Sequence, residues 1–371
     1  MKKILFIPFF FLLLTCAFLP LGEAQQRNPD YYIRFNGVNY SLRDYMMEEI
    51  DTFETGHEAL RTAIELASEG DSIYYNGELL LNDTLVLSKN IDLYIEKVFL
   101  EGDFDAVVLQ LDYYYFMGTV EIGTIDVTNA SFTHSAVTVL GSTSNLHLKI
   151  DLLRNNNYEG TGLNLTSLEG EHIASCIFDL RWIRGFYYGI YANQVGHHLT
   201  NSYMVDNEFH MGTFTDLNVT ISLNSEWDGS ITNFAFFDAL FQAPIYDRVI
   251  ELNGRVCNTL FFNCWIWDIP PTTYIIYASE FTEGIMFKNC RTLFEETTFL
   301  DSYVDLSNST KMVDCWHQTN GGSGEYGYYY DYPTPTPTEE GLSSQQELVT
   351  FVIVIAIVGI LGGALGLGRV F

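Results

Sequence analysis

Short runs in which apolar and polar residues alternate recur through the middle of the chain. Most are bounded by Gly, Asn or Ser, and such alternation is typical of a β-strand with one buried face. The runs are Ala136–Leu140, Gly162–Leu165, Gly189–Ala192, Val219–Leu223, Val249–Leu252, Ile275–Tyr277 and Tyr303–Leu306. This pattern predicts a domain of many short strands, with two or three strands in each repeat.

An Asn or Asp residue preceded by apolar residues returns at a near-constant interval. The eight residues are Asp126, Asp151, Asp179, Asn207, Asp238, Asn263, Asn289 and Asp314, spaced by 25 to 31 residues. This period indicates a solenoid, whose repeats share one core because no repeat buries its own apolar face. We expect the eight side chains to stack at one turn and to hydrogen-bond backbone groups that the turn leaves unpaired. A cation-binding acidic stripe is the alternative role.

The segment from His57 to Ser68 has helical periodicity. Its apolar side chains share one face and are Ala59, Leu60, Ala63, Ile64 and Ala67. Gly70 follows as a natural stop. We expect this amphipathic helix to cover the open first coil of the solenoid.

The helix and the residues after it resemble the opening of pectin-lyase-like β-helix proteins. The blocks that carry the resemblance are Glu58–Ile64, Gly70–Tyr74 and Asn90–Leu93, and the likeness extends over residues 55–318. It implies a right-handed parallel β-helix. It implies no single activity, because that superfamily includes lyases, hydrolases, phage depolymerases and non-catalytic adhesins.

Two other architectures compete with this one. A leucine-rich repeat also shows a repeating Asn, but it requires leucines and a recurring helical stretch that this chain lacks. A propeller requires longer repeats with several full antiparallel strands. We therefore predict an all-β fold, a right-handed parallel β-helix with an N-terminal capping α-helix, followed by one C-terminal transmembrane helix.

The two ends of the chain predict export and membrane attachment. Residues 1–24 have the charged start, the apolar run and the small cleavage-site residues of a secretory signal peptide. Residues 347–368 include an uncharged apolar stretch that reaches about 30 Å as a helix, enough to cross a bilayer core. A glycolipid-anchor signal is the alternative for this end. We expect the body of the protein to lie outside the cell.

The predicted organisation follows from these segments. It comprises a signal peptide at 1–24, a lead-in at 25–54, a β-helix ectodomain at 55–318, a Gly/Tyr- and Pro-Thr-rich stalk at 319–346, a transmembrane helix at 347–368 and a cytoplasmic tail at 369–371.

The chain is strongly acidic, with 18 Lys and Arg against 47 Asp and Glu and a formal net charge of −29. Such a field repels phosphate backbones, so we expect no nucleic-acid partner. Asn-x-Ser/Thr triplets fit an exported glycoprotein. They begin at Asn39, Asn82, Asn129, Asn164, Asn218 and Asn308.

Three cysteines, Cys264, Cys290 and Cys315, each follow a member of the Asn/Asp series. Stacked coils would place neighbouring Cα atoms within the disulfide range of about 4.4–6.8 Å. Two adjacent members could pair, or all could form a reduced ladder of small apolar groups. Cys257 is another partner for Cys264. We expect no zinc site, because no CxxC pair occurs.

The strings that carry catalysis in related hydrolases, Asn-Thr-Asp, Asp-Asp and Gly-His-Gly, do not occur. Arg181 beside two carboxylates of the next coil would suit a lyase, in which a base acts next to calcium-binding acids. Calcium is therefore the one cofactor left open. A second group contains two carboxylates, which would suit an inverting hydrolase at a separation of roughly 6.5–9.5 Å. The weak catalytic candidates are Arg181, Asp206 and Glu208 in the first group and His197, Glu226 and Asp228 in the second.

Tyr and Trp side chains are the candidates for ligand binding, because a flat ring covers the apolar side of a sugar. They are Tyr187, Tyr188, Tyr191, Trp227, Trp265 and Trp267. Together with the tether and the missing catalytic strings, they favour a non-catalytic cell-surface protein that binds glycans or other surface partners, or forms part of the envelope. A surface-tethered polysaccharide lyase or glycoside hydrolase is the alternative.

Overall fold

The computed structural model of the protein describes residues 29–111, 118–128, 131–196, 202–225, 230–242, 248–267, 274–279, 281–292, 310–313, 316–319 and 322–325. The chain divides into two compact units, Met1–Tyr326 and Gly327–Phe371. All described residues belong to the first unit. The predicted signal peptide, transmembrane helix and cytoplasmic tail, and most of the stalk, lie outside them. No helix among the described residues is long and apolar enough to cross a membrane.

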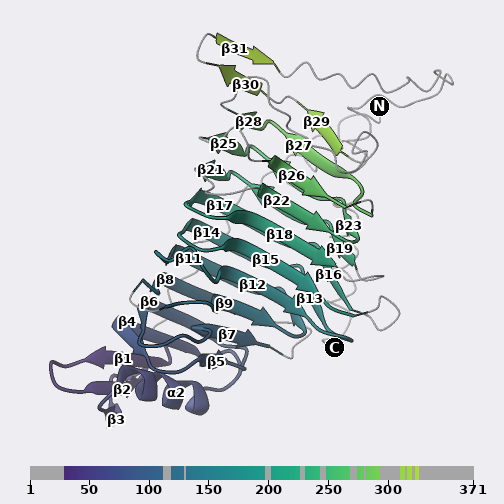
Figure 1. The fold of residues 1–371 in the computed structure, drawn as a ribbon. Helices are drawn as coiled ribbons and strands as arrows, with labels where there is room; N and C mark the ends of the chain where they lie inside the picture. The colour runs from purple at the N-terminus through teal and green to yellow at the C-terminus, as the bar shows by residue number, and fades with distance from the viewer. Residues whose placement is uncertain are drawn as a thin grey trace, which may run out of the picture. The chain divides into compact units, whose positions relative to one another are not determined.

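The first unit is a parallel β-solenoid whose coils contribute strands to three sheets (Figure 1). Sheet B contains β5 (Leu85–Leu87), β7 (Val107–Gln110), β9 (Ser135–Leu140), β12 (Thr161–Ser167), β15 (Tyr188–Gln194), β18 (Val219–Ser225), β22 (Arg248–Asn253) and β26 (Tyr274–Ala278). Sheet C contains β10 (Thr143–Ser144), β13 (His172–Ala174), β16 (Tyr203–Val205), β19 (Ser230–Thr232) and β23 (Val256–Cys257). The predicted β-solenoid is thereby confirmed.

Sheet A is the largest of the three and runs the length of the described solenoid. Its continuous strands are β4 (Ser72–Leu81), β6 (Asp92–Leu100), β8 (Thr119–Asp126), β11 (His147–Arg154), β14 (Ile177–Arg184) and β17 (Glu208–Thr215). Its shorter strands are β20 (Ala235–Phe237), β21 (Leu240–Gln242), β24 (Leu260–Phe262), β25 (Trp265–Trp267), β27 (Ile285–Lys288), β28 (Arg291–Thr292), β29 (Thr310–Val313), β30 (Trp316–Thr319) and β31 (Gly322–Glu325).

The core fills the space enclosed by the three sheets. Alternate residues of each strand point inward, and identical inward positions stack on the coil below. One stack consists of phenylalanines whose rings lie nearly parallel, with centroids 4.6–5.0 Å apart. Its members are Phe178, Phe209, Phe236, Phe261 and Phe287, all buried. This ladder contains five of the 27 phenylalanines of the chain.

Helix α2 (Gly56–Leu66) covers the first coil, as predicted (Figure 1). The Thr55 hydroxyl caps its N-terminus by accepting from the Glu58 amide at 3.2 Å. Its buried face includes Ala59, Leu60 and Ala63. The helix therefore supplies the apolar contacts that a further coil would otherwise provide.

The lead-in before the helix has a structure that the sequence patterns did not indicate. Strands β1 (Tyr31–Phe35), β2 (Tyr40–Asp44) and β3 (Glu49–Phe53) form an antiparallel unit. β1 also pairs in parallel with β4, so this unit extends sheet A beyond the first coil.

The expectation that the eight Asn and Asp residues form one column is wrong. Asp126, Asp151 and Asp179 lie within the long strands β8, β11 and β14. Asn207 is fully buried between β16 and β17. Asp314 lies outside the described residues. The remaining three stack as predicted and are Asp238, Asn263 and Asn289.

The physical reason is that the strand which each coil contributes to sheet A is continuous in some coils and divided in others. In the earlier coils it is continuous for eight residues or more, whereas later coils divide it in two, as in β20 and β21. The residue at the break has a left-handed backbone, with φ of 61° at Asp238, 56° at Asn263 and 54° at Asn289. Asn and Asp tolerate that conformation better than most residues.

A second column of left-handed residues lies at the sharp turn from sheet C to sheet A. Each backbone N–H donates to a carbonyl of the next coil, at 2.9–3.1 Å. The column consists of Asn145, Ser175, Asp206, Asn233 and Asn258, with φ between 53° and 61°. The sequence pattern did not reveal this turn, because Ser175 interrupts the Asn and Asp series.

The cysteines stack as their register indicated, because Trp265 pairs with Arg291 and places Cys264 next to Cys290. Both are buried. Cys264 is a free thiol whose Sγ lies 3.8 Å from the Phe236 carbonyl oxygen, so it is joined neither to Cys290 nor to Cys257. Pairing of Cys290 with Cys315 stays a prediction, since Cys315 lies outside the described residues.

Candidate functional site

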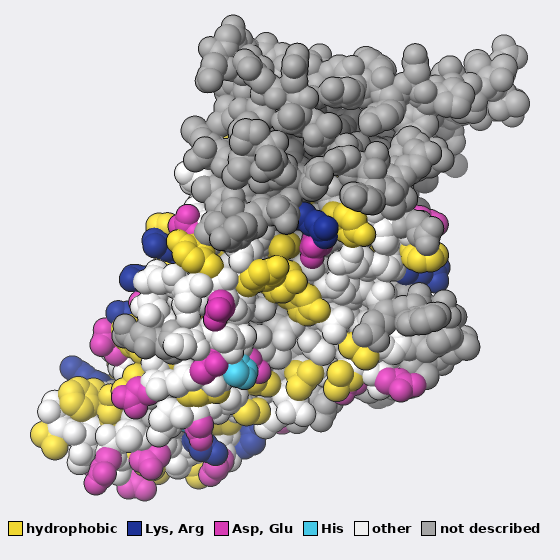
Figure 2. Space-filling model, in the orientation of Figure 1, with side chains coloured by type: hydrophobic (Ala, Val, Ile, Leu, Met, Phe, Trp, Pro, Cys, Tyr) yellow, Lys and Arg dark blue, Asp and Glu magenta, His cyan; other side chains and the backbone are white. Residues whose placement is uncertain are grey.

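Three tyrosines gather on the outer face of sheet B. Tyr187 immediately precedes β15, and Tyr188 and Tyr191 belong to it. The ring centroids lie 4.7 Å apart between Tyr187 and Tyr188 and 5.0 Å apart between Tyr188 and Tyr191. Tyr187 is 43% exposed. Hydrophobic side chains gather over the middle of this sheet in the space-filling view (Figure 2). The structure thus brings together three of the predicted ligand-binding residues.

Strand β22 places a charged pair in the same region. The Arg248 Nη1 atom lies 2.6 Å from Glu251 Oε1, and the other Glu251 oxygen accepts from the Ser222 hydroxyl at 3.2 Å. The Arg248 guanidinium also lies over the Tyr277 ring, 4.3 Å from its centroid. Register aligns Tyr191, Ser222, Glu251 and Tyr277 across four neighbouring strands. The row therefore has an aromatic ring at each end, with a hydroxyl and a carboxylate between them.

A row of amides runs beside the tyrosine row on the same face. Asn193, Asn224 and Asn253 occupy matching positions of β15, β18 and β22. Asn253 donates to the Asn224 carbonyl oxygen at 2.8 Å, and Asn224 donates to the Ser222 hydroxyl at 3.0 Å. The Asn193 amide makes no hydrogen bond with any part of the chain that the structure describes. Each of these asparagines directly follows one of the alternating runs that the sequence analysis predicts as strands. The row could therefore have been predicted from the sequence.

Tyr188 keeps its proton at all physiological pH values. Burial, the negative charge of Glu251 and the neighbouring tyrosines together raise the pKa of Tyr188 to about 12, against the opposing effect of Arg248. The hydroxyl is therefore a neutral group that can both donate and accept a hydrogen bond. Together the tyrosines and amides form a surface suited to a ligand with flat apolar faces and many hydroxyls. We name these six residues the tyrosine–amide patch: Tyr187, Tyr188, Tyr191, Asn193, Asn224 and Asn253.

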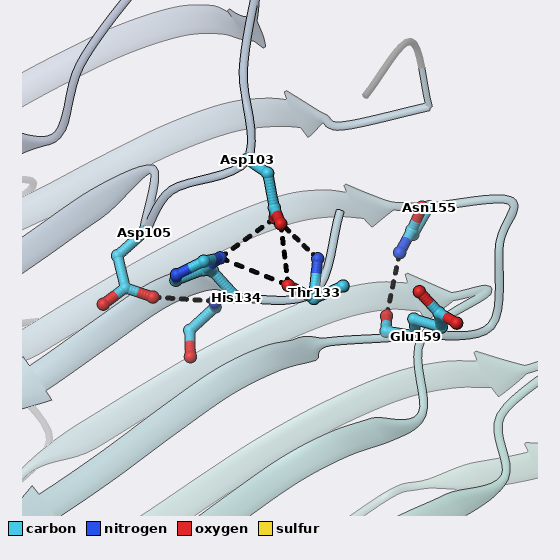
Figure 3. A network of polar contacts seen from close by, with 7 residues as sticks. Asp103, Asp105, Thr133, His134, Asn155 and Glu159 are labelled. Atoms are coloured by element: carbon cyan, nitrogen blue, oxygen red, sulfur yellow. Dashed lines mark hydrogen bonds and ion pairs between the residues drawn. The ribbon is translucent and has the colours of Figure 1, made fainter. Parts of the chain in front are cut away.

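A polar network lies at the edge of sheet B, two coils before Tyr187 (Figure 3). The Asp103 carboxylate accepts from the Thr133 amide and the Thr133 hydroxyl, both at 2.7 Å, and lies 2.9 Å from His134 Nδ1. Desolvation alone would raise the pKa of Asp103, but these hydrogen bonds outweigh it and lower the pKa to about 2.

This network does not have the geometry of a nucleophile and base. Both contacts of the imidazole use Nδ1, which lies 2.9 Å from Asp103 and 3.4 Å from the Thr133 hydroxyl. A catalytic imidazole instead uses one nitrogen for the orienting carboxylate and the other for the nucleophile. The network therefore ties the loop before β7 to the loop before β9, and Asp105 reinforces the tie by accepting from the Ser135 amide at 2.8 Å.

The predicted catalytic grouping around Arg181 is not formed. Strand register places Arg181 beside Gly212, whereas Glu208 pairs with Ile177 at the other end of the strand. Asp206 lies earlier still, in the turn before β17. The error arose because matching repeats by spacing alone cannot locate a residue along its strand. The other predicted group, Glu226, Asp228 and His197, lies outside the described residues.

Arg181 instead lines a shallow hollow of about 310 Å³ on the outer face of sheet A. The hollow is lined by Glu121, Ile122, Lys149, Ile150, Asp151, Asp179, Leu180, Arg181, His210, Met211, Gly212 and Asp238. The side chains of Lys149 and Arg181 make no hydrogen bond or ion pair within the described part of the chain. The Asp179 carboxylate lies 2.7 Å from His147 Nε2.

The predicted tryptophans do not join the tyrosines. Trp265 is 40% exposed on sheet A, and the Arg291 guanidinium lies 4.9 Å from its ring centroid. The Trp267 backbone pairs with Gln242 in the same sheet. Trp227 lies outside the described residues. Aromatic identity alone did not reveal which of the three sheets a residue would occupy.

The glycosylation triplets have unequal surroundings. Asn82 is exposed, Asn39 and Asn164 are half-buried, and Asn129 and Asn308 lie outside the described residues. Asn218 is only 7% exposed, and its amide nitrogen donates to the Tyr158 carbonyl at 3.3 Å. Its nitrogen is therefore not accessible in the folded protein.

No group of three or more His, Cys, Asp or Glu side chains able to hold a metal ion occurs within the described ranges. The carboxylates of the hollow therefore do not converge as calcium ligands would. Comparison with known proteins finds no matching family model, no matching curated protein and no matching solved structure.

Proposed function

We propose that the protein is a non-catalytic, membrane-anchored cell-surface protein whose tyrosine–amide patch binds a glycan. In this proposal the solenoid is a right-handed β-helix of the pectin-lyase-like type, exported by the signal peptide at 1–24 and tethered by the helix at 347–368. The observation that carries the proposal is the joint presence of Tyr187, Tyr188 and Tyr191 beside a row of amides on one sheet face.

The chemistry of a neutral sugar matches this surface. Tyrosine rings cover the apolar face of a pyranose, and amide groups both donate to and accept from its hydroxyls. The patch rests on strands, so its side chains are held by the sheet before a ligand arrives, and little conformational entropy is lost on binding. The unpartnered Asn193 amide offers a hydrogen-bonding site without breaking an internal contact.

Substitution of Tyr191 tests the proposal. We expect Tyr191→Ala to weaken glycan binding by about tenfold or more, since the loss of one stacked ring costs on the order of 1–2 kcal/mol. The measurement is binding of the full chain to an array of neutral and acidic polysaccharides, followed by titration of the best ligand. Tyr45→Ala is the matched control, because Tyr45 is 63% exposed in the turn between β2 and β3. Equal binding by both variants would contradict the assignment.

A second candidate function, a polysaccharide lyase or glycoside hydrolase, is favoured by the hollow on sheet A. There Lys149 and Arg181 lie among Asp151, Asp179 and Asp238. An Arg or Lys that abstracts a proton beside carboxylates would suit lyase chemistry. Release of unsaturated products or new reducing ends, abolished in Arg181→Ala and retained in Tyr191→Ala, would replace the non-catalytic proposal with this one.

A further inference from the structure

One outward-facing column crosses sheet A from β1 to β27, with one residue from each coil between them. Read from the N-terminal end it is Tyr32, Tyr74, Tyr94, Glu121, Lys149, Asp179, His210, Phe237, Phe262 and Lys288. The rings of Tyr74 and Tyr94 stack at 4.4 Å, and those of His210 and Phe237 stack at 5.2 Å. The column thus begins with three tyrosines, has polar and charged residues in the middle, and continues through two phenylalanines to Lys288.

The order of residues in this column is self-complementary. Its midpoint lies between Lys149 and Asp179. When a second copy of the column is laid against the first in reverse order about that point, each residue lies opposite a favourable partner. The resulting pairs are Lys149 with Asp179, Glu121 with His210, Tyr94 with Phe237, Tyr74 with Phe262, and Tyr32 with Lys288, which correspond to opposite charges, stacked rings and a cation over a ring.

The four central positions of the neighbouring outward column have the same property about the same midpoint. Asp151 and Arg181 occupy its two central positions, next to Ile150 and Leu180 of the paired strands. Gly123 and Gly212 occupy the flanking positions. Inversion therefore places Asp151 opposite Arg181 and one glycine opposite the other. The two glycines carry no side chains, which leaves room for the long central ones.

This face also carries basic side chains, which reduce the repulsion between two copies of an acidic chain. The chain has only 18 Lys and Arg, yet β11 and β14 together carry Lys149, Arg154, Arg181 and Arg184. Lys149 and Arg181 are the two without a partner among the described residues. Ten strands about 4.8 Å apart, each roughly 23 Å long, give a face of the order of 1,000 Å², which is enough for a stable interface.

From these observations we propose that the outer face of sheet A binds a second copy of this chain. The two copies pack face to face, related by a two-fold axis that runs along the strand direction between β11 and β14. Each column then faces the same column of the other copy in reverse order, as an isologous interface requires. Lys149 of each copy pairs with Asp179 of the other, and Arg181 pairs with Asp151, so the hollow of each monomer is filled by its partner. This inference does not depend on glycan binding at sheet B.

Charge exchange across the interface tests the proposal. Sedimentation velocity of the full chain in density-matched detergent should show a dimer for the native protein. Lys149→Asp and Asp179→Lys each place like charges opposite one another at two symmetry-related points. Each should raise the dimer dissociation constant by about tenfold or more. The double variant exchanges both charges, restores opposite pairs, and should return the constant to within about threefold of native.

Arg61→Asp is the matched control, because it changes the net charge as Lys149→Asp does, on the exposed side of helix α2. It should leave the dimer intact. An unchanged far-UV circular dichroism spectrum and melting temperature in all variants show that they remain folded. A native chain that is monomeric up to about 100 µM would overturn the proposal. So would a double variant no better than the single ones, or a glycan that competes for this face of a monomer.

Discussion

At the scale of single residues, Asn207 is the side chain on which the solenoid most visibly depends. It is fully buried, its carbonyl oxygen accepts from the Cys176 amide at 3.0 Å, and its nitrogen donates to the Ile173 carbonyl at 3.0 Å. We expect Asn207→Leu to lower the free energy of unfolding by roughly 2–4 kcal/mol, since it leaves two buried backbone groups without partners. Asn193→Leu, at a partly exposed amide without a described partner, should change it by less than about 0.5 kcal/mol. Urea unfolding followed by circular dichroism measures both.

The lowered pKa of Asp103 predicts how the free energy of unfolding depends on pH. Its pKa is about 2 in the folded chain and 3.8 without the fold, so the folded state binds this proton less readily. The contribution of Asp103 to stability is therefore complete above pH 4 and is lost as the pH falls toward 2. It should not exceed about 1 kcal/mol, because the carboxylate is exposed to solvent. Asp103→Asn should flatten this part of the stability curve, measured by unfolding between pH 2 and 6. An unchanged slope would contradict the role given to the network.

At the scale of elements, the sequence was sufficient to predict a strand or helix wherever one residue type repeats at one structural position. The alternating runs identified sheet B, and the face of Ala59 and Ala63 identified helix α2. The Asn and Asp series was reliable only from Asp238 onward, where a break in the strand requires a left-handed residue. Earlier in the chain, residues such as Asp151 matched the period by chance, because a strand accepts an outward aspartate at many positions.

The candidate site was harder to predict, because it depends on the register between coils. Tyr187, Tyr188 and Tyr191 are close in sequence, so their proximity could be foreseen. The row formed by Asn193 and Asn253 needs the exact coil length, which varies through the chain. Arg181 and Glu208 illustrate the same limit, since both belong to sheet A yet lie at opposite ends of its strands.

At the scale of the whole molecule, the solenoid should tolerate loss of one complete coil. Glu208 occupies the strand position of Ile177 one coil later, so deletion of residues 177–207 joins Cys176 to Glu208 in the existing register. Stability in such repeats is a sum of coil and neighbour terms. We expect a folded, shorter variant with a lower melting temperature, seen by circular dichroism and small-angle scattering, which no longer binds glycan because Tyr187 to Tyr191 are absent.

Deletion of residues 177–191 is the control for the coil deletion. It removes about half a coil, so inward positions of the following strands would turn toward solvent. This variant should not fold. If both deletions behave alike, the coils are not interchangeable units, and the stacking described for sheets A and B does not govern stability.

The asparagine rows have a direction. Asn233 donates to Asp206, Asn263 donates to Asp238, and Asn289 donates in turn to Asn263. An ionised carboxylate only accepts, so in the column Asp238, Asn263 and Asn289 the aspartate at the N-terminal end dictates the orientation of both amides after it. The amide dipoles of this column therefore point the same way, and a coil added after Asn289 could extend the column only with another donor.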